Sequence, residues 1–287
     1  MVYEALQDSL RRHVFRLAGE IGERNVFHYD ALQAAAGYVR GVWEDQGFEV
    51  VSQAYEANGL VCENLAVTCP GAGPGLILVG AHYDSVKGSP GANDNGSGVA
   101  GLLEISRALS QATPAMTVRC VAFVNEEPPF FYWGKMGSLV YAKAARARSD
   151  AIRLMVSLEM LGCYHQEPGT QDYPPLLGYF YPDTGNFIAF VSNLKSSGLL
   201  RKTVQAFQTH SDFPLQSLAA PSLVPGVGWS DQLSFWREGY KALMVTDTAF
   251  FRYPYYHTAA DTPDKIDYAS MARVVAGLQR TFEGLRV

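Results

Sequence analysis

Apolar runs of strand length alternate with helical patterns through the middle of this 287-residue chain. A helical pattern at about 97–111 is followed by a strand-like run at 117–125, a second helix near 138–148 and a second strand at 151–160. Strands that alternate with helices in this way form a largely parallel sheet covered by helices. The pattern therefore predicts an α/β domain.

The rest of the chain extends this pattern on both sides. Further helices are predicted at 3–21, 29–46, 187–207 and 268–282, and further strands at 48–55, 61–68, 76–83, 217–223 and 242–248. The segment 164–186 is rich in Pro, Gly and Tyr and shows neither period, so we expect a long surface loop, and such loops are often functional. No repeat or linker divides the chain, which predicts one domain over 1–287 with a helical segment at 1–47.

Composition narrows the range of partners. The net charge is −5 and the Lys and Arg residues are scattered, so a nucleic acid is not expected as a partner. The longest apolar runs fall well short of the roughly 20 residues that a membrane helix needs, so no membrane contact is expected. The N-terminal residues lack the pattern of a signal peptide. The chain should be soluble, and either cytoplasmic or, with a signal peptide removed, secreted or periplasmic.

None of the cysteines belongs to a C-x-x-C motif. Cys120 lies in an apolar strand, where a buried free thiol is the usual state. A disulfide between Cys62 and Cys69 stays open as an alternative.

A histidine and an aspartate stand at the end of the strand predicted at 76–83. His82 and Asp84 are two residues apart, so they can point to the same side of the strand. A metal-bound histidine usually has a carboxylate behind it that orients the ring, and Asp84 is a candidate for that supporting role. Taken alone, however, the pair is more typical of a hydrogen-bonded histidine at a strand end.

Further acidic residues lie where later segments begin or end. Asp94 stands in the glycine-rich stretch 91–98 just before a helix, where a carboxylate can bridge two metals or, alternatively, cap the helix. Glu126 and Glu127 follow the strand at 117–125, at the end where α/β sheets bind their ligands. Adjacent carboxylates repel each other unless cations compensate them. Because neighbouring side chains diverge, one glutamate can bind metal while the other faces water.

Two more residues of ligand type follow. Glu159 interrupts an otherwise apolar strand, and a buried carboxylate needs a cation or a hydrogen-bond donor. His257 comes after the last central strand, and Asp261 and Asp264 nearby are candidates to orient its ring. Ligands of His, Asp and Glu type at successive strand ends, without cysteine, suit two divalent ions such as zinc, cobalt or manganese.

In their order along the chain, these motifs resemble the co-catalytic zinc peptidases of metallopeptidase family twenty-eight. This family includes aminopeptidases, glutamate carboxypeptidases and, as diverged relatives, glutaminyl cyclases. The resemblance runs from about residue 64 to residue 265, and its most specific motifs are H-Y-D-S at 82–85, G-A-N-D-N-G-S-G at 91–98, E-E at 126–127 and Y-H-T at 256–258. It implies a single zinc-peptidase catalytic domain of α/β class, with a twisted, mostly parallel mixed sheet of about eight strands between helices.

The resemblance also implies roles for individual residues. It implies these metal ligands: His82 and Glu159 for one ion, Glu127 and His257 for the other, and Asp94 as a bridge between them. Glu126 then acts as the general base, with Asp84 behind His82. The peptide bond between Asp94 and Asn95 is expected to be cis. The implied cofactors are two divalent metal ions, with zinc as the first choice.

A catalytic tyrosine is expected near the second histidine. Glu126 would take a proton from the attacking water and deliver it to the departing amine. The hydroxyl of Tyr256, which adjoins His257, would stabilise the oxyanion. Tyr253 and Tyr255 stay open as alternatives for this role.

Three positions depart from the family pattern. Glu159 stands where aspartate is usual, which weakens an aminopeptidase assignment because carboxypeptidases of the wider clan also have glutamate there. The segment 128–135 replaces a short glycine-rich turn, and its aromatic residues either line a substrate pocket or form a hydrophobic plug or a subunit contact. Gln232 stands where histidine is common, and Asp231 beside it is expected to brace the site or contact substrate.

The expected activity is that of a metal-dependent exopeptidase with a peptide as its partner, an aminopeptidase before a carboxypeptidase. The alternatives are a glutaminyl cyclase with one zinc ion and a non-catalytic binding module of the transferrin-receptor kind, and the complete ligand set argues against both. The sequence has no G-x-S-x-G motif of a serine hydrolase, and the glycines at 71–75 precede a strand instead of following one, unlike a dinucleotide-binding motif. The preferred side chain and the oligomeric state, a homo-oligomer included, stay open.

Overall fold

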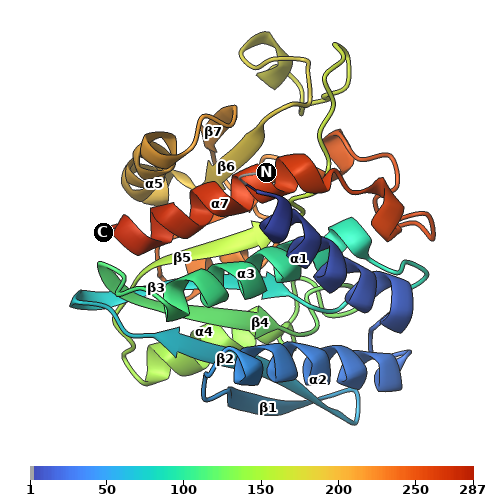
Figure 1. The fold of residues 1–287 in the computed structure, drawn as a ribbon, viewed down its shortest axis with the longest axis vertical. Coiled ribbons are helices and arrows are strands. Elements are labelled where there is room, and N and C mark those ends of the chain that lie inside the picture. Colours follow the sequence, from blue (N-terminus) through green and yellow to red (C-terminus); the bar gives the residue numbers. More distant parts are fainter. Residues whose placement is uncertain (1–2) are drawn as a thin grey trace.

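One mixed sheet of eight strands runs through the protein, in the order β1-β2-β4-β3-β5-β8-β6-β7 (Figure 1). The computed structural model describes residues 3–287, so Met1 and Val2 of the predicted helical segment 1–47 lie outside the described residues. The strands are β1 (Val51–Ala57), β2 (Leu60–Cys69), β3 (Gly73–His82), β4 (Met116–Phe123), β5 (Ile152–Glu159), β6 (Ile188–Ser192), β7 (Leu215–Ala219) and β8 (Ala242–Thr246).

The four central strands β4, β3, β5 and β8 are parallel to one another. On one side, β2 pairs antiparallel with β4 and β1 antiparallel with β2. On the other side, β6 is antiparallel to β8, and β7 is parallel to β6. This confirms the predicted α/β class and the mixed sheet of about eight strands. It also brings the carboxyl ends of four strands to one edge of the sheet.

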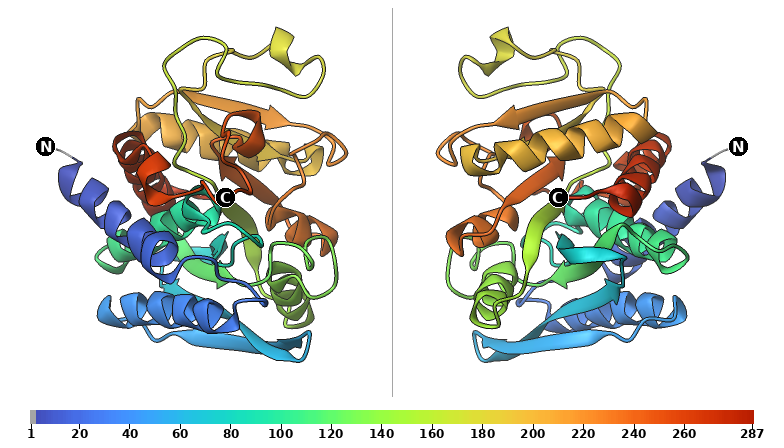
Figure 2. Two further views of the ribbon diagram at one scale, coloured as in Figure 1. Left: turned by 90° about the vertical axis from the view of Figure 1, so that its right-hand side faces the viewer. Right: turned by 90° about the vertical axis from the view of Figure 1, so that its left-hand side faces the viewer.

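Helices cover both faces of the sheet, as Figure 2 shows from two sides. The α-helices are α1 (Glu4–Val14), α2 (Tyr29–Asp45), α3 (Gly98–Ser110), α4 (Gly137–Ala147), α5 (Ser197–His210), α6 (Gln232–Arg237) and α7 (Tyr268–Gly284). The π-helical and 3₁₀ turns are η1 (Phe15–Ile21), η2 (Ala92–Ser97), η3 (Leu177–Tyr179), η4 (Leu194–Ser196), η5 (Ala249–Phe251) and η6 (Pro263–Lys265). In the described residues, α4 and α6 pack on one face, and the larger helical layer packs on the other.

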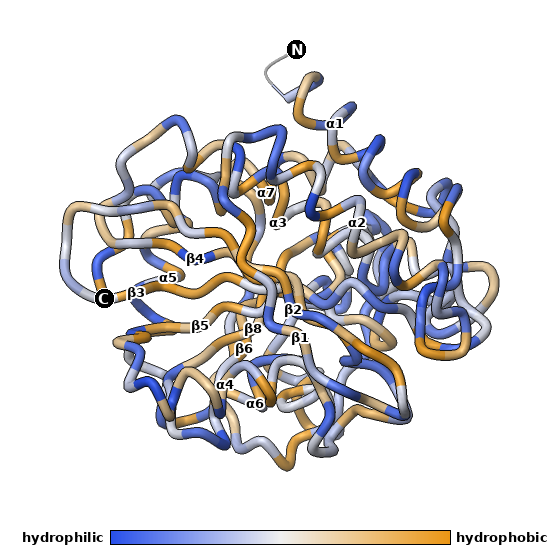
Figure 3. Tube along the Cα trace, turned by 90° about the horizontal axis from the view of Figure 1, so that it is seen from below, coloured by the Kyte–Doolittle hydropathy of each residue, from blue (hydrophilic) through white to orange (hydrophobic). Residues whose placement is uncertain are grey.

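The central strands are apolar on both sides because both of their faces are buried. In β3, Ile77 and Val79 belong to the core cluster under α3 and α7, while Leu76 and Leu78 belong to the cluster under α4 and α6. Figure 3 shows the strands as hydrophobic segments in the middle of the fold. Burial of both faces explains why the central strands appear in the sequence as continuous apolar runs.

The helix predicted at 187–207 is wrong in its first part. Ile188–Ser192 is β6, whose residues are all buried, and the helix α5 begins only at Ser197. A short apolar run has no period that separates a buried strand from a buried helix, so its pairing with β7 and β8 decides its structure. The segment predicted as a loop at 164–186 is a loop, with no strand and with η3 as its one short helical element.

The structure also answers expectations about peptide-bond geometry, the cysteines and membrane-spanning helices. The peptide bond between Asp94 and Asn95 is cis, as the resemblance implies, and so is the bond between Pro128 and Pro129. Cys62 and Cys69 are buried free thiols and form no disulfide. None of the helices in the part of the chain that the structure describes is long and apolar enough to cross a membrane.

Candidate metal centre

The residues predicted to bind metal lie at the carboxyl ends of the central strands. His82 is the last residue of β3, and Glu159 is the last residue of β5. Glu126 and Glu127 follow β4, which pairs with β3, and His257 lies in the loops after β8. Because parallel strands end at the same edge of a sheet, residues far apart in the sequence meet there.

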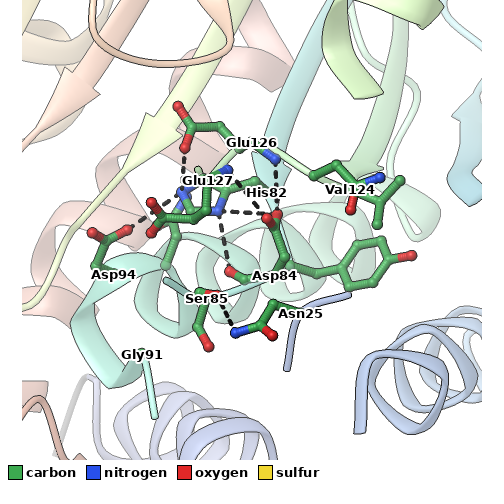
Figure 4. Close-up of polar contacts among 12 residues, drawn as sticks. Asn25, His82, Asp84, Ser85, Gly91, Asp94, Val124, Glu126 and Glu127 are labelled. Atoms are coloured by element: carbon green, nitrogen blue, oxygen red, sulfur yellow. Dashed lines mark hydrogen bonds and ion pairs between the residues drawn. The ribbon is translucent and has the colours of Figure 1, made fainter. Parts of the chain in front are cut away.

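Two groups of ligand atoms form at this edge, and they share one carboxylate. In the first group, Nε2 of His82 lies 3.4 Å from Oδ1 of Asp94 and 3.4 Å from Oε2 of Glu159. In the second, Nε2 of His257 lies 3.1 Å from Oδ2 of Asp94 and 3.5 Å from Oε2 of Glu127. The two oxygens of Asp94 therefore face different groups, and Figure 4 shows this carboxylate beside His82 and Glu127.

These separations fit pairs of atoms that share a metal ion. Ligand atoms bound at about 2.0–2.1 Å to one tetrahedral zinc ion lie about 3.3–3.4 Å from each other. Nε2 of His82 and Oε1 of Glu127 are buried, and neither has a hydrogen-bond partner within residues 3–287. A buried polar atom without a partner is rare unless a water or an ion binds it. The residues of the two groups therefore fit two divalent ions.

The charge of the site supports the same fit. Burial raises the pKa of Glu126 and Glu127 well above the ordinary value for glutamate, and neighbouring carboxylates raise both further. Burial also raises the pKa of Glu159. A buried cluster of carboxylates is costly without cations, and divalent ions would offset this cost.

Asp84 lies behind His82 rather than in either ligand group. Nδ1 of His82 lies 3.2 Å from the backbone oxygen of Asp84 and 3.5 Å from its Oδ1. The same carboxylate accepts hydrogen bonds from the backbone nitrogens of Glu126 and Glu127, each at 3.1 Å (Figure 4). Asp84 therefore links the orientation of the histidine ring to the position of both glutamates.

We expect Asp84→Asn to lower metal affinity by about 10–100-fold, the range found for residues that support metal ligands. An amide nitrogen at either oxygen position would face the backbone N–H of Glu126 or Glu127, where only an acceptor fits. Competition with a chelator of known affinity measures the loss. Asp264→Asn is a matched control, because Asp264 is exposed and bonds only to Thr262 and Lys265 among the described residues. Equal affinities for both variants would contradict the supporting role of Asp84.

The loop that carries Asp94 is held by side chains from distant segments. Asp261 accepts hydrogen bonds from the backbone nitrogens of Asn93 at 2.8 Å and Asp94 at 3.1 Å. Asn95 donates to the backbone oxygen of Leu158 at 2.8 Å, which ties the loop to β5. The expectation that Asp261 orients His257 therefore finds no support, since this carboxylate holds the loop of Asp94 instead. Asp264 does not support that role either, because its carboxylate bonds to Thr262 and Lys265 and to no atom of His257 among the described residues.

Glu126 and Tyr256 lie beside the ligand groups without belonging to them. Oε2 of Glu126 is 3.9 Å from Nε2 of His82. The ring of Tyr256 stacks on the ring of His257, with 3.8 Å between centroids and 19° between planes. Tyr253 donates its hydroxyl hydrogen to Asp261 at 2.7 Å, so this competitor is already engaged. The geometry thus favours Tyr256 over Tyr253 for a role at the oxyanion.

A deep cleft begins at the metal-ligand groups and has an empty volume of ≈ 840 Å³, open solvent included. Glu159 and Tyr256 form its end near the site. Its largely apolar wall includes Tyr173, Leu177, Tyr181, Phe187, Ala189, Val191, Val227, Trp229, Met244, Phe250 and Phe251. No Lys or Arg of the described residues lines it. A cleft with this largely apolar wall suits an apolar side chain.

The aromatic segment 128–135 takes no part in this cleft. Phe130 is buried in the core, whereas Tyr132 and Trp133 are 56% and 70% exposed. Arg237 of α6 covers the ring of Tyr132 at 4.0 Å and donates to its backbone oxygen at 2.9 Å. The structure therefore does not place this segment in the wall of the cleft, and its role as a substrate pocket, a plug or a subunit contact stays a prediction. Most of the cleft wall comes instead from 173–191 and 216–256. Of these residues, the sequence predicted a possible functional role for the loop at 164–186 alone.

Two neighbours of Glu159 complete the site. Ser230 donates its hydroxyl hydrogen to Oε2 of Glu159 at 2.6 Å. Asp231 is fully buried, and burial raises the pKa of its carboxyl group to about 7. Asp231 lies near enough to Glu159 for the charge of that carboxylate to contribute to this increase. Sequence reasoning pointed to Asp231 and missed the role of Ser230.

Comparison with known proteins supports the same family. The family model described as Peptidase family M28 matches residues 64–281. Uncharacterized protein YfbL of Escherichia coli K12 is 38% identical over 284 residues, which cover 96% of this chain and 87% of YfbL. The probable lipoprotein aminopeptidase LpqL of Mycobacterium tuberculosis is 28% identical over 243 residues, which cover 79% of this chain. The chain covers only 45% of LpqL, which is less than half of that relative.

Solved structures share the fold at low sequence identity. A leucine aminopeptidase precursor from Bacteroides thetaiotaomicron has a TM-score of 0.73 at 19% identity, over 98% of this chain and 97% of that chain. A glutaminyl cyclase from the same organism has a TM-score of 0.72 at 19% identity, over 98% of both chains. These two likenesses concern the fold alone. The family match over most of the sequence, together with the similarity to YfbL, shows that this chain belongs to peptidase family M28.

Proposed function

We propose that this protein is an aminopeptidase that uses two divalent metal ions, with zinc as the first choice. The observation that carries the proposal is the pair of ligand groups that share Asp94. His82 and Glu159 would hold one ion, Glu127 and His257 would hold the other, and Asp94 would bridge them. Histidine and carboxylate donors without cysteine are typical of catalytic zinc sites with two ions.

The side chains around the ligand groups supply the proton transfers. Two bound ions lower the pKa of a water toward about 7 and polarise a carbonyl group. Glu126 accepts the proton of the attacking water, because its carboxylate lies beside the ligand groups and belongs to neither. It then gives this proton to the nitrogen of the departing amine. The hydroxyl of Tyr256 donates a hydrogen bond to the carbonyl oxygen as negative charge develops there.

The chemistry of the cleft favours attack at the amino end of a peptide. A carboxypeptidase needs a cation for the terminal carboxylate of its substrate, and no Lys or Arg in the described part of the chain lines the cleft. The charged residue that does line it is Glu159, whose carboxylate is assigned to the first ion, so the described lining offers no positive charge to a substrate carboxylate. The apolar walls would receive the side chain of the first residue. A large apolar N-terminal residue is therefore the proposed substrate feature.

A comparison of blocked and free substrates tests this proposal. We expect hydrolysis of a leucyl anilide, and a kcat/KM at least about 10²-fold lower for its N-acetyl form, because the site loses its amine. A chelator should abolish the activity and added zinc should restore it, which would also exclude a non-catalytic binding module. Release of the last residue from an N-acetylated peptide would instead identify a carboxypeptidase and contradict the proposal.

A glutaminyl cyclase is the second candidate, because a solved enzyme of that kind shares the fold over nearly the whole chain. Both ligand groups are complete here, whereas one zinc ion is expected of a cyclase. A peptide that begins with glutamine separates the two activities. The aminopeptidase would release free glutamine, and a cyclase would release ammonia while leaving the peptide chain intact.

A further inference from the structure

The N-terminal segment of the chain inserts one charged side chain beneath the candidate metal centre. Arg24 lies between η1 and α2, before the first residue of the family match, and none of its surface is exposed. Its guanidinium donates hydrogen bonds to two sets of backbone oxygens. The first set lies in its own N-terminal segment and consists of the oxygens of Leu17 at 3.4 Å and Gly22 at 3.2 Å.

On the side of the metal centre, Arg24 binds both ends of the segment that connects two ligands. Its Nε donates to the backbone oxygen of Tyr83, the residue after His82, at 2.7 Å. Its two terminal nitrogens donate to the backbone oxygens of Pro90 at 2.5 Å and Gly91 at 2.8 Å. One planar group thus joins the end of β3 to the start of the loop that carries the shared carboxylate.

Gly91 shows how closely this loop is packed. Its φ of +64° is in the left-handed region that favours glycine. A Cβ atom there would collide with the backbone oxygen of Asp94, and it would lie 2.6 Å from Cβ of Ser85 and 3.3 Å from a terminal nitrogen of Arg24. The Gly91 backbone oxygen also accepts from the backbone nitrogen of Gly96 at 3.1 Å. The guanidinium therefore binds the loop at a position where its path leaves no room for a side chain.

Backbone contacts fasten the same segment to the strand end. The backbone nitrogen of Arg24 donates to Oγ of Ser85 at 3.1 Å, and the backbone nitrogen of Ser85 donates to the oxygen of Arg24 at 3.0 Å. The side chain of Asn25 donates to the backbone oxygen of Ser85 at 3.1 Å, a contact drawn in Figure 4. Ser85 follows Asp84 directly, so these bonds hold the chain immediately after the residue that supports His82.

Charge explains why an arginine occupies this position. Burial lowers the pKa of Arg24 to about 10, and the nearby charges of Asp84, Asp261, Asp94 and Glu127 oppose that decrease. The guanidinium remains charged at neutral pH. In the described residues it forms no ion pair with a carboxylate, so its negative partners are the acidic residues of the metal centre at longer range.

We propose that Arg24 is a positioning residue that holds Asp94 in place between the two metal-binding groups, so that the N-terminal segment is part of the metal centre. Arg24 binds the backbone oxygens of the loop, while Asp261 binds the backbone N–H groups of Asn93 and Asp94 from the opposite end of the chain. The loop is thus held by a cation at its oxygens and by an anion at its nitrogens. This inference rests on the proposed two-metal function.

The test compares metal affinity in Arg24→Met, Arg24→Lys and the unchanged protein. Chelator competition gives the affinities for Zn²⁺, and absorption spectra with Co²⁺ report the geometry of the bound ions. We expect Arg24→Met to lose about 10–100-fold in affinity and to change the Co²⁺ spectrum. Arg24→Lys keeps the charge but cannot bind the three oxygens at once, because an ammonium group lacks the planar fork, so it should restore only part of the affinity.

Arg252→Met is the matched control. Arg252 is also a buried arginine that binds backbone oxygens, but these belong to Cys163 and Phe187 and not to the loop of Asp94. This variant should lose stability and keep its metal affinity. If Arg24→Met bound Zn²⁺ as tightly as the unchanged protein, the inference would be overturned. If Arg24→Met does not fold, an Arg24→Lys protein that binds Zn²⁺ as tightly as the unchanged protein would overturn it. An unchanged protein that binds no metal would contradict the proposed function instead.

Discussion

Glu126→Gln is expected to lower kcat for a leucyl anilide by about 10²–10⁴-fold while the metal content stays the same, which is the range for loss of a general base. The amide has the shape of the carboxylate but cannot accept the proton of the attacking water. Glu126 belongs to neither ligand group, so its replacement leaves the ligands in place. Steady-state kinetics and metal analysis on the same sample measure both quantities.

Glu127→Gln is the matched comparison for this variant. It makes the same replacement, of one carboxylate oxygen by an amide nitrogen, in the neighbouring residue. However, Oε2 of Glu127 lies 3.5 Å from Nε2 of His257 within the second ligand group. This variant should therefore lose metal together with activity. If Glu126→Gln kept its turnover within about tenfold of the unchanged protein while metal remained bound, another residue would have to be the base.

His82→Ala is expected to lose metal from the first group and to lower metal affinity there by at least about 10²-fold, beyond the effect of a supporting residue. The variant removes the nitrogen that faces both Asp94 and Glu159, so these carboxylates lose their neutral co-ligand. The number of Zn²⁺ ions per chain, measured by equilibrium dialysis, should fall from two to one or less. A bound metal stabilises the folded state, so added zinc should also raise Tm less than in the unchanged protein.

His28→Ala provides the control for this experiment. His28 is an exposed histidine that pairs with Glu23 at 3.0 Å and belongs to neither ligand group. It should keep the metal content and the zinc-dependent rise in Tm. A His82→Ala protein that bound two zinc ions as tightly as this control would remove His82 from the proposed ligands.

Much of the fold is predictable from the sequence because the central strands carry a local signal. The run 76–82 is apolar on both faces and follows a turn-rich cluster, and β3 does form there. The sequence predicts the helix after the loop of Asp94 at 97–111, and this helix spans Gly98–Ser110. The prediction failed at Ile188–Ser192, where five buried residues are too few to show a period. There the pairing partners β7 and β8, distant in the sequence, decide the structure.

The candidate site shows the same division. Its ligand residues are recognisable because polar groups interrupt apolar strands or follow them directly, as Glu159 does at the end of β5. The supporting contacts carry no such signal. Asp261 was expected beside His257, yet it binds the loop of Asp94, and Arg24 showed no local pattern at all. Such contacts join residues that are far apart in the sequence, so no local periodic pattern can predict them.

The alternation of strands and helices, the residues at the strand ends and the family resemblance can all be predicted from the sequence, because each depends on residues near one another in the chain. Which side chains meet across the sheet edge becomes visible in the folded structure. It alone shows that Asp94 faces two ligand groups, that the cleft is lined from 173–191 and 216–256 and not from 128–135, and that Arg24 lies beneath the loop of Asp94. The physical reason is that strand order and loop packing bring distant residues together, and these arise from burial of the whole chain and not from any single segment.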